Sequence, residues 1–549
     1  MRAAFSRLSG RMQRLLSLLI FPALLLSPTL LLSVATQANT LSLAEVGDAL
    51  IDANLRQKAP LVEQLLSIED DDTLRFAQTL LEGDLYYRKA DRLLLTKDDD
   101  DLQAFFTQEP VEISSKRAIK KISVNNRLRI QLRAGIARMQ IFASSEATRL
   151  TAAQSLLKSA DDIDIATLNE AIEQETSPKV SEVLALVVGL KQLQSDNDYE
   201  RRMGIDALSG SLYPEVRGAL SNFIRDCVAG GLTKDAALAA EAMEKIETRL
   251  KINSVIENLY FGLALGAVLL LAAIGLAITF GVMGVINMAH GEMIMLGAYT
   301  TYVVQQLMPD HIGMSLVIAI PAAFVVSGLV GIAIERGVIR HLYGRPLETL
   351  LATFGISLIL QQAVRSIFSP LNREVATPEW MAGTFSINPA LALTYNRLYI
   401  IIFSLLVLAL LALILKRTLF GLQMRAVTMN RPMASSMGIR TGWVDALTFG
   451  LGSGIAGIAG VALSQLTNVG PNMGQAYIID SFMVVVFGGV GNLWGTLVGA
   501  MSLGVVNKIL EPWAGAVVAK ILVLVFIILF IQKRPRGLFA LKGRAAEMG

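Results

Sequence analysis

Nine apolar stretches of membrane-spanning length follow one another in the second half of the chain. They lie near residues 258–281, 289–308, 313–336, 348–368, 397–416, 443–467, 477–489, 494–511 and 515–532. A helix needs about 20 apolar residues to cross the hydrocarbon core of a bilayer, and a spanning segment must satisfy all its backbone polar groups internally. The stretches therefore predict a polytopic α-helical membrane domain, in which the second and seventh helices are short or broken by glycine.

The first half of the chain has a different composition. Acidic runs such as Glu69–Asp72 lie before residue 253. Apolar positions recur there every three or four residues, which is typical of amphipathic helices. Similar phrases at 149–156 and 201–208, with prolines that open helices after Ser177 and Tyr213, favour irregular helical-pair repeats of the HEAT type. We expect a short strand or an extended loop only within 104–131.

The first residues have the pattern of a signal peptide. Four arginines precede an apolar run from Leu15 to Val34, and the small residues Ala35 and Ala38 follow it. We expect cleavage after Ala38, with Ala35 as the second choice, and an uncleaved signal anchor is the alternative. Either outcome places residues 39–250 outside the cytoplasm.

Basic residues give an independent indication of orientation. Clusters around Arg336, Arg425 and Lys533 follow the third, fifth and last apolar stretches. By the positive-inside rule, all three are cytoplasmic when residue 255 starts outside. The sequence thus predicts an all-α, multi-pass protein of a bacterial inner membrane with these parts: a signal peptide at 1–38, a periplasmic HEAT-like domain at 39–252, a membrane domain with broken helices at 253–540, and a cytoplasmic tail at 541–549.

A polar, glycine-rich interruption lies at residues 281–292, between the first two apolar stretches. Irregular backbone and ionisable side chains are tolerated at membrane depth only where protein or a water-filled path shields them. We interpret the segment as part of a conduit. The alternative is a short cytoplasmic turn in which Glu292 is an ordinary first-turn acid.

The basic loop at 421–439 is the second informative segment. Small and polar residues recur there at every fourth or fifth position, so a short helix would gather them on one side. They are Gly421, Arg425, Asn430, Ala434 and Gly438. Such a surface suits the docking of a cytoplasmic partner, and the alternative is a basic interfacial helix that meets lipid headgroups.

The sequence offers little support for catalysis, metal binding or nucleic-acid binding. The three histidines lie near three different span ends, and Cys227 is the one cysteine. The net charge of +3 comes with no basic stripe interleaved with aromatics. The glycine-rich segment Phe487–Gly495 lacks the lysine and Ser/Thr of a phosphate-binding loop, so its glycines favour a broken helix. If ATP drives this protein, another subunit hydrolyses it.

Three separated motifs resemble the permease subunits of branched-chain amino acid ABC importers: Gly284–Glu292, the loop at 421–439, and Phe487–Gly499. The resemblance covers about residues 255–540. The exported helical extension and the basic segment Arg534–Arg544 are further similar to the members that import urea. The resemblance implies a heteromeric importer with a second permease, cytoplasmic ATPase subunits that bind ATP, a periplasmic solute-binding protein and surrounding lipid. It implies no cofactor and no ATPase site in this chain, which is then not an enzyme.

Three functions stay open at this point. They are a permease for urea or short amides, a permease for branched-chain amino acids, and a membrane sensor or scaffold whose exported repeats bind a ligand. For a small neutral solute the path should present amide, hydroxyl and backbone partners, and each candidate side chain could instead make a helix–helix hydrogen bond. The candidates are Asn287, His290, Glu292, Ser357, Gln361, Asp480 and Asn492. We expect His290 and Glu292 to form a structural pair.

Overall fold

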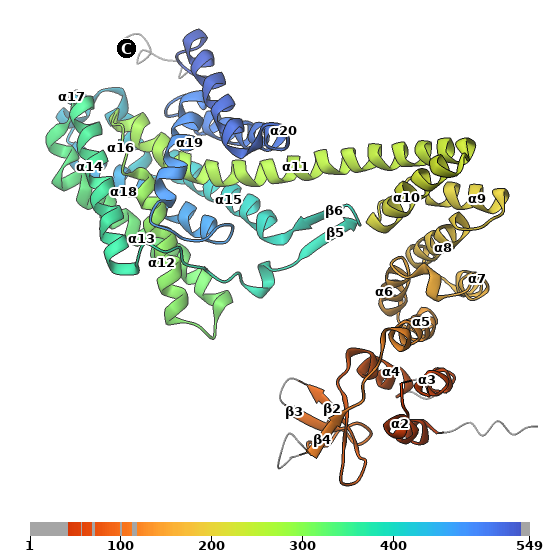
Figure 1. Cartoon of the computed structure of the whole chain (residues 1–549). Helices are drawn as coiled ribbons and strands as arrows, with labels where there is room; N and C mark the ends of the chain where they lie inside the picture. Colours follow the sequence, from red (N-terminus) through yellow and green to blue (C-terminus); the bar gives the residue numbers. More distant parts are fainter. Residues whose placement is uncertain (1–41, 56, 69–71, 99–100, 112–117, 540–549) are drawn as a thin grey trace, which may run out of the picture. The chain divides into compact units, whose positions relative to one another are not determined.

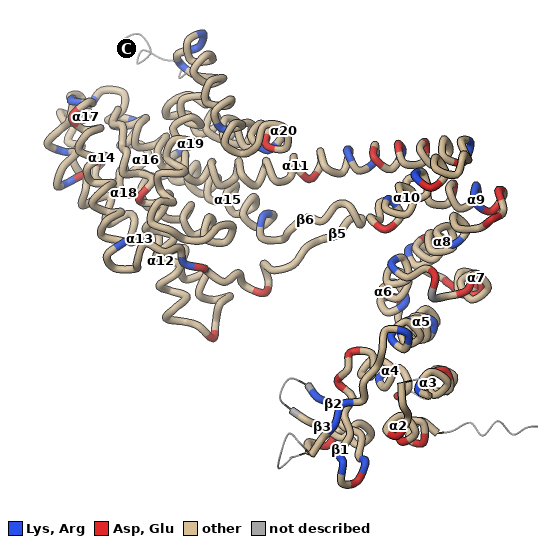
Figure 2. The backbone as a smooth tube through the Cα atoms, viewed as in Figure 1, with Lys and Arg blue, Asp and Glu red and all other residues tan. Residues whose placement is uncertain are grey.

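The computed structural model describes residues 42–539, except 56, 69–71, 99–100 and 112–117. The predicted signal peptide and cytoplasmic tail lie outside these residues. The chain divides into two compact units, Met1–Glu244 and Lys245–Gly549, and Figure 1 gives the order of their elements. Charged residues are frequent along the first unit and sparse along most of the second (Figure 2). This difference matches the two compositions seen in the sequence.

The first unit begins with three helices and a small sheet. The helices are α2 (Leu43–Asp52), α3 (Lys58–Leu66) and α4 (Thr73–Glu82), and the strands are β1 (Leu85–Arg88), β2 (Leu94–Asp98), β3 (Asp101–Ala104) and β4 (Ile119–Lys121). The strands pair antiparallel in the order β3-β2-β1-β4. Phe76 and Phe105 meet edge to face in the core beneath them. The all-α prediction is therefore wrong for this part of the unit, although β4 confirms the strand expected within 104–131.

Helices form the rest of the first unit. They are α5 (Asn126–Ile141), α6 (Glu146–Leu156), α7 (Ile165–Gln174), α8 (Pro178–Leu193), α9 (Asp198–Leu208) and α10 (Pro214–Gly230), with a short 3-10 turn, η2 (Ala160–Asp162). Proline opens α8 and α10 as expected, because its missing N–H is not needed in the first helical turn. One side of α8 forms a buried apolar stripe that consists of Val180, Val183, Leu184, Val187 and Leu190. Helix α8 packs against α6, α7 and α9 and is the centre of this layer.

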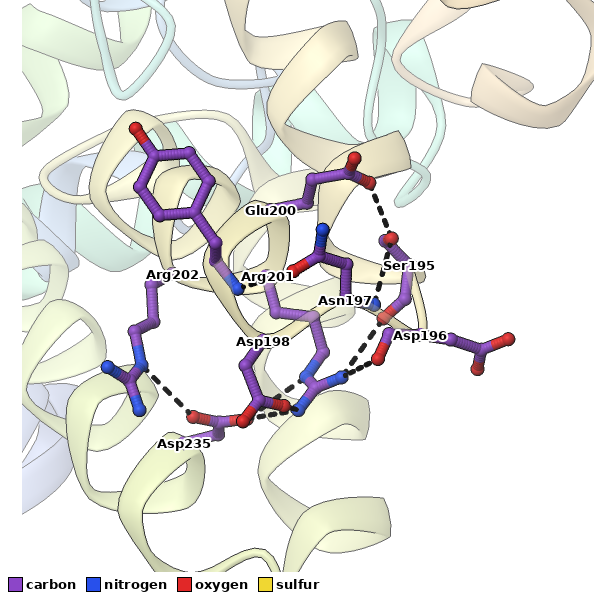
Figure 3. Close-up of polar contacts among 9 residues, drawn as sticks. Ser195, Asp196, Asn197, Asp198, Glu200, Arg201, Arg202 and Asp235 are labelled. Carbon is purple, nitrogen blue, oxygen red and sulfur yellow. Dashed lines mark hydrogen bonds and ion pairs between the residues drawn. The ribbon is translucent and has the colours of Figure 1, made fainter.

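One buried ion pair holds the first turn of α9 in place (Figure 3). Arg201 donates from Nη2 to Asp235 Oδ2 over 2.7 Å and from Nη1 to the carbonyl of Asp196 over 2.8 Å. It also contacts Asp198. Asp235 lies in the first turn of α11 (Thr233–Met283), so the pair joins α9 to that helix.

The second unit is a helical bundle. Its long helices are α11, α12 (His290–Leu307), α13 (Ile312–Gly337), α14 (Pro346–Phe368), α15 (Tyr395–Arg417), α18 (Thr441–Ser464), α19 (Met473–Gly488) and α20 (Leu493–Lys533). Shorter elements are η3 (Ile339–Leu342), η4 (Glu379–Met381), the hairpin of β5 (Thr384–Asn388) and β6 (Leu391–Thr394), α16 (Leu419–Met429) and α17 (Arg431–Ser436). All nine predicted apolar stretches fall on helices to within about one turn.

Six helices of the described chain are long and apolar enough to cross a membrane: α11, α13, α14, α15, α18 and α20. Helix α19 is shorter, at 16 residues. Helix α20 is two helices joined at Gly515, where φ is 76° and ψ is 160°, three positions after Pro512. Few residues other than glycine adopt such a positive φ, which explains why the chain can change direction there.

Contacts between the connections agree with the predicted layout. Arg373 and Val469 exchange backbone hydrogen bonds of 2.7 and 2.8 Å, and both lie in connections predicted on the outer side. On the predicted inner side, Leu538 N donates to Phe487 O over 2.9 Å, and Arg336 stacks on Trp443. Each of these contacts joins two segments that the alternation of spans places on one side.

Glycine lets the central helices approach closely. A Cβ atom built on Gly297 of α12 would lie 2.0 Å from the carbonyl oxygen of Gly457 in α18, and one on Gly291 would lie 2.4 Å from that of Gly474 in α19. Between membrane helices, small residues allow this backbone contact and the dispersion energy that it brings. Helices α12 and α18 are accordingly buried along most of their length.

Candidate functional site

A buried polar stripe runs along one side of α14. Its members are Thr349, Thr353, Ser357 and Gln361. With 3.6 residues per turn, positions four apart stay on one side of a helix. The other sides carry exposed apolar residues such as Leu351 and Ile359. A helix with a polar inner side and an apolar outer side suits a bundle surrounded by lipid, where ionisable and polar groups face the interior.

The stripe meets the first turn of α12. Ser357 Oγ donates to Glu292 Oε1 over 2.9 Å, and Gln361 Nε2 donates to the same oxygen over 2.8 Å. Thr353 Oγ1 accepts a hydrogen bond of 3.1 Å from the backbone N–H of Met288. We call these residues, together with Asn287, the α12–α14 seam. Here the structure brings together three of the predicted path residues, Glu292, Ser357 and Gln361. Asn287 directly precedes Met288, which donates to Thr353.

Local sequence explains why the chain before α12 is not helical. Helix α11 ends at Met283, and Gly284 has a φ of 66°. Asn287 Oδ1 then accepts a hydrogen bond of 3.0 Å from the N–H of Ala289, which is an Asx turn. The predicted interruption is confirmed, and it leads Glu292 into the first turn of α12, where the helix dipole favours an acid.

Two side-chain atoms of the seam have hydrogen-bonding capacity to spare. Asn287 Nδ2 and Glu292 Oε2 are buried, and neither has a hydrogen-bond partner within the described part of the chain. A buried polar atom without a partner costs about 1–3 kcal/mol. An amide donor can bind the acceptor of a solute, and a carboxyl oxygen can bind its donor.

The expected pair of His290 and Glu292 does not form. His290 Nε2 lies 2.9 Å from the carbonyl oxygen of Ala272 in α11. Because a carbonyl oxygen only accepts hydrogen bonds, the proton is assigned to Nε2. Glu292 turns instead toward α14. The two side chains are two positions apart on a helix and therefore point to different neighbours.

Two further candidates lie apart from the seam. Asp480 of α19 pairs with Lys520 of α20. Asn492 caps α20, because its Oδ1 accepts hydrogen bonds from the N–H groups of Trp494 and Gly495 at 3.0 and 3.2 Å. Its Nδ2 donates to the carbonyl oxygen of Phe539 over 3.3 Å, so helix capping and this contact use both ends of the Asn492 amide. Lys520 was missed because its partner lies 40 positions away.

The loop at 421–439 forms two short helices, α16 and α17, and the expected single helix is wrong. Asn430 ends α16 and caps α17, with its Oδ1 accepting from Met433 N over 3.0 Å. Gly421 and Ala434 are buried, Arg425 contacts the carbonyl oxygen of Leu415, and Gly438 has a φ of 86°. These residues shape the loop and do not share one exposed side.

Three exposed methionines lie on this loop. Met429, Met433 and Met437 are 73%, 60% and 75% exposed. Their spacing of four residues is visible in the sequence and could have marked them. Methionine is flexible and polarisable, and proteins use it at adaptable binding surfaces. We call these three residues the methionine surface.

Together, the apolar helices and the buried polar seam of the second unit are typical of a membrane permease component. A sequence profile described as "Branched-chain amino acid transport system / permease component" matches residues 258–531. No solved structure matches the chain.

Individual relatives match the same class. The chain is 30% identical over 298 residues to the high-affinity branched-chain amino acid transport system permease protein BraD of Pseudomonas aeruginosa, covering 52% of this chain and 96% of the relative. It is also 30% identical over 294 residues to the LivH permease protein of Escherichia coli K12, covering 52% and 94%. The chain belongs to the family of branched-chain amino acid ABC transport permease components.

Proposed function

We propose that this chain forms part of the transmembrane path of an ABC importer, with its solute crossing along the α12–α14 seam. The observation that carries the proposal is the cluster of Glu292, Ser357 and Gln361, buried between two helices of a membrane domain. Polar groups at this depth are expensive unless they serve a path or one another. ATP is hydrolysed by separate cytoplasmic subunits, and a second permease completes the path.

The proposed solute is urea or a short amide. Asn287 Nδ2 offers a donor and Glu292 Oε2 an acceptor, and urea has a carbonyl oxygen and N–H groups that complement both. The buried positions of α14 from Thr349 to Gln361 are all polar. They suit a polar solute better than leucine, because the leucine side chain requires apolar contacts. The resemblance of the exported extension and of the segment from Arg534 to urea permeases supports the same substrate.

Branched-chain amino acids are the competing solute, and the names of BraD and LivH favour them directly. Both relatives are matched over nearly their whole length. Uptake of radiolabelled urea and of leucine in a strain lacking this gene decides between the two. We expect the restored chain to return urea uptake and leave leucine uptake unchanged. Recovery of leucine uptake alone would assign the amino-acid substrate and reject urea.

The first unit is proposed to be an exported, HEAT-like domain on the periplasmic side, where a solute-binding protein delivers its cargo. Its support is the succession of packed helices from α6 to α10, together with the predicted orientation of the spans. The C-terminal end, after Lys533, is proposed to be cytoplasmic.

The methionine surface is the proposed docking site for an ATPase subunit. It lies in the connection after α15, which the positive-inside rule places in the cytoplasm. Asp445 binds Arg431, and Arg431 stacks on Tyr343. These contacts hold α17 against the ends of α18 and η3, so that a force on the loop reaches the spans. The residues first predicted for coupling would act by shaping this loop.

A further inference from the structure

An ion pair joins two apolar helices of the second unit, α19 and α20, and α19 packs against α12 of the seam. Lys520 Nζ is 2.9 Å from Asp480 Oδ2. Asp480 is buried, with 8% of its side chain exposed, whereas half of the Lys520 side chain, 50%, is exposed. The pair links α19 to the part of α20 that follows Gly515.

The position of Asp480 shows where along α19 the ammonium group lies. Asp480 lies seven residues after Met473, where α19 begins, which corresponds to about 10 Å along the helix axis at 1.5 Å per residue. Lysines near the ends of spans commonly extend toward the headgroups. Lys520 instead reaches the middle of a 16-residue helix.

An exposed charge at this position restricts what can surround it. Placing a lysine against hydrocarbon at the centre of a span is unfavourable on every scale. The other exposed side chains around Lys520 in this part of α20 are apolar. Val518, Leu522 and Leu529 lie on the opposite side of the helix, and Val517 and Leu524 lie beside Lys520. Between positions 516 and 532 Lys520 is the single charged residue, so it alone requires polar surroundings.

A second ion pair lies on the other arm of the same helix. Lys508 and Glu511, before the break at Gly515, form a pair whose side chains are partly exposed. Each pair has a net charge of zero. Ionisable residues within membrane segments commonly pair with one another in this way.

We propose that the Asp480–Lys520 pair faces the water-filled translocation path, so that α19 and the second half of α20 form a wall of that path. This inference rests on the proposed transport function. Asp480 was a candidate from the sequence; Lys520 and the wall to which it belongs are new. The remaining wall opposite the pair comes from the second permease.

Cysteine accessibility tests the proposal in the complete importer. Cys227 is the one cysteine of the chain, so Cys227→Ala gives a background without thiols in this subunit. Lys520→Cys and Leu522→Cys are then compared in membrane fragments whose two faces are both open to a charged methanethiosulfonate. The cysteine thiolate attacks the reagent to form a mixed disulfide and displaces methanesulfinate, and the thiolate forms only where water reaches it. Leu522 is the matched control, because two positions along a helix turn the side chain by about 200°.

We expect Lys520→Cys to react at least about tenfold faster than Leu522→Cys, because a thiol that faces water ionises far more readily than one that faces lipid. Equal or slower labelling of Lys520→Cys would overturn the proposal. Leu524→Cys leaves the ion pair intact and lies one turn further along on the Lys520 side. Should Lys520→Cys fail to assemble, Leu524→Cys must react faster than Leu522→Cys, or the proposal is wrong.

The labelling result is independent of the solute. Fast labelling in an importer that does not take up urea would remove the proposed substrate and leave the path wall in place. Urea uptake combined with an unreactive Lys520→Cys would support the proposed substrate and reject the path wall.

Discussion

Glu292 and Arg201 illustrate two ways in which single ionisable residues are accommodated. Glu292 lies between two membrane helices and receives donors from Ser357 and Gln361 on one oxygen only. Arg201 lies in the first unit and is surrounded by acceptors, namely two carboxylates and two carbonyl groups. The hydrogen bond to Asp235 raises the pKa of the Arg201 guanidinium, so it stays charged. The first arrangement keeps a free acceptor, and the second holds elements together.

Replacing Arg201 should destabilise the first unit. Arg201→Met leaves Asp235 buried without its main partner, which is strongly unfavourable for a charge. We expect the unfolding temperature of this unit to fall by roughly 5 °C or more. Arg202→Met is the matched control, since Arg202 is half exposed and lies 3.7 Å from the same carboxylate. An exposed ion pair contributes little, so equal shifts in differential scanning calorimetry would contradict the structural role of Arg201.

At the scale of elements, glycine contacts set the distances between helices. Gly297 and Gly457 bring α12 and α18 together, and Gly275 of α11 approaches Gly452 of α18 in the same way. Because these helices also position Glu292 opposite α14, the packing of the bundle and the geometry of the seam are coupled.

Gly297→Ala should therefore loosen the bundle. The new Cβ would lie 2.0 Å from the carbonyl oxygen of Gly457, and overpacking of this kind typically costs 1–3 kcal/mol. Gly355→Ala is the control, because nothing lies within 4 Å of its Cβ position and alanine favours a helix by about 1 kcal/mol. Thermal stability in detergent should fall for the first variant and stay equal or rise for the second. A neutral Gly297→Ala would show that α12 and α18 are not in close contact.

A charge on the methionine surface should uncouple transport from ATP hydrolysis. Met433→Glu places a carboxylate in an apolar contact, and desolvating it is unfavourable. We expect solute-stimulated ATP hydrolysis by the complete importer to fall by about tenfold or more, the equivalent of about 1.4 kcal/mol of docking energy. Ser435→Glu is the control, since Ser435 is exposed on a different side of α17. Full stimulation of the Met433→Glu importer would place the ATPase elsewhere.

Hydropathy predicted the membrane helices well because length and apolarity are local properties. The non-helical segment at 284–289 could also be predicted from the sequence, because Gly284 and Asn287 are typical of a break between helices. The small sheet was missed because β1 to β4 have only three to five residues each, too few to show alternation clearly. Contacts such as Ser357 with Glu292 join residues 65 positions apart, and no spacing in the sequence specifies them.

For the whole molecule, the orientation in the membrane determines where each part acts. Alkaline phosphatase fused after Lys251 should be active, since the first unit is proposed to be exported and this enzyme requires an oxidising compartment. A reporter that needs the cytoplasm should be active when fused after Arg425. Activity in the opposite pattern would reverse the orientation inferred from the arginine clusters.

The central claim is that solute crosses along the α12–α14 seam. The most direct measurement is ATP-driven uptake of radiolabelled urea into proteoliposomes that contain the complete importer, comparing Gln361→Leu with Gln362→Leu. Gln361 is buried against Glu292, and its neighbour Gln362 is exposed on another side of α14. The account predicts that Gln361→Leu lowers urea uptake by about tenfold, the loss of one hydrogen bond to a charged group, while assembly and basal ATP hydrolysis persist and Gln362→Leu transports normally. Normal uptake by an assembled Gln361→Leu importer would contradict the claim.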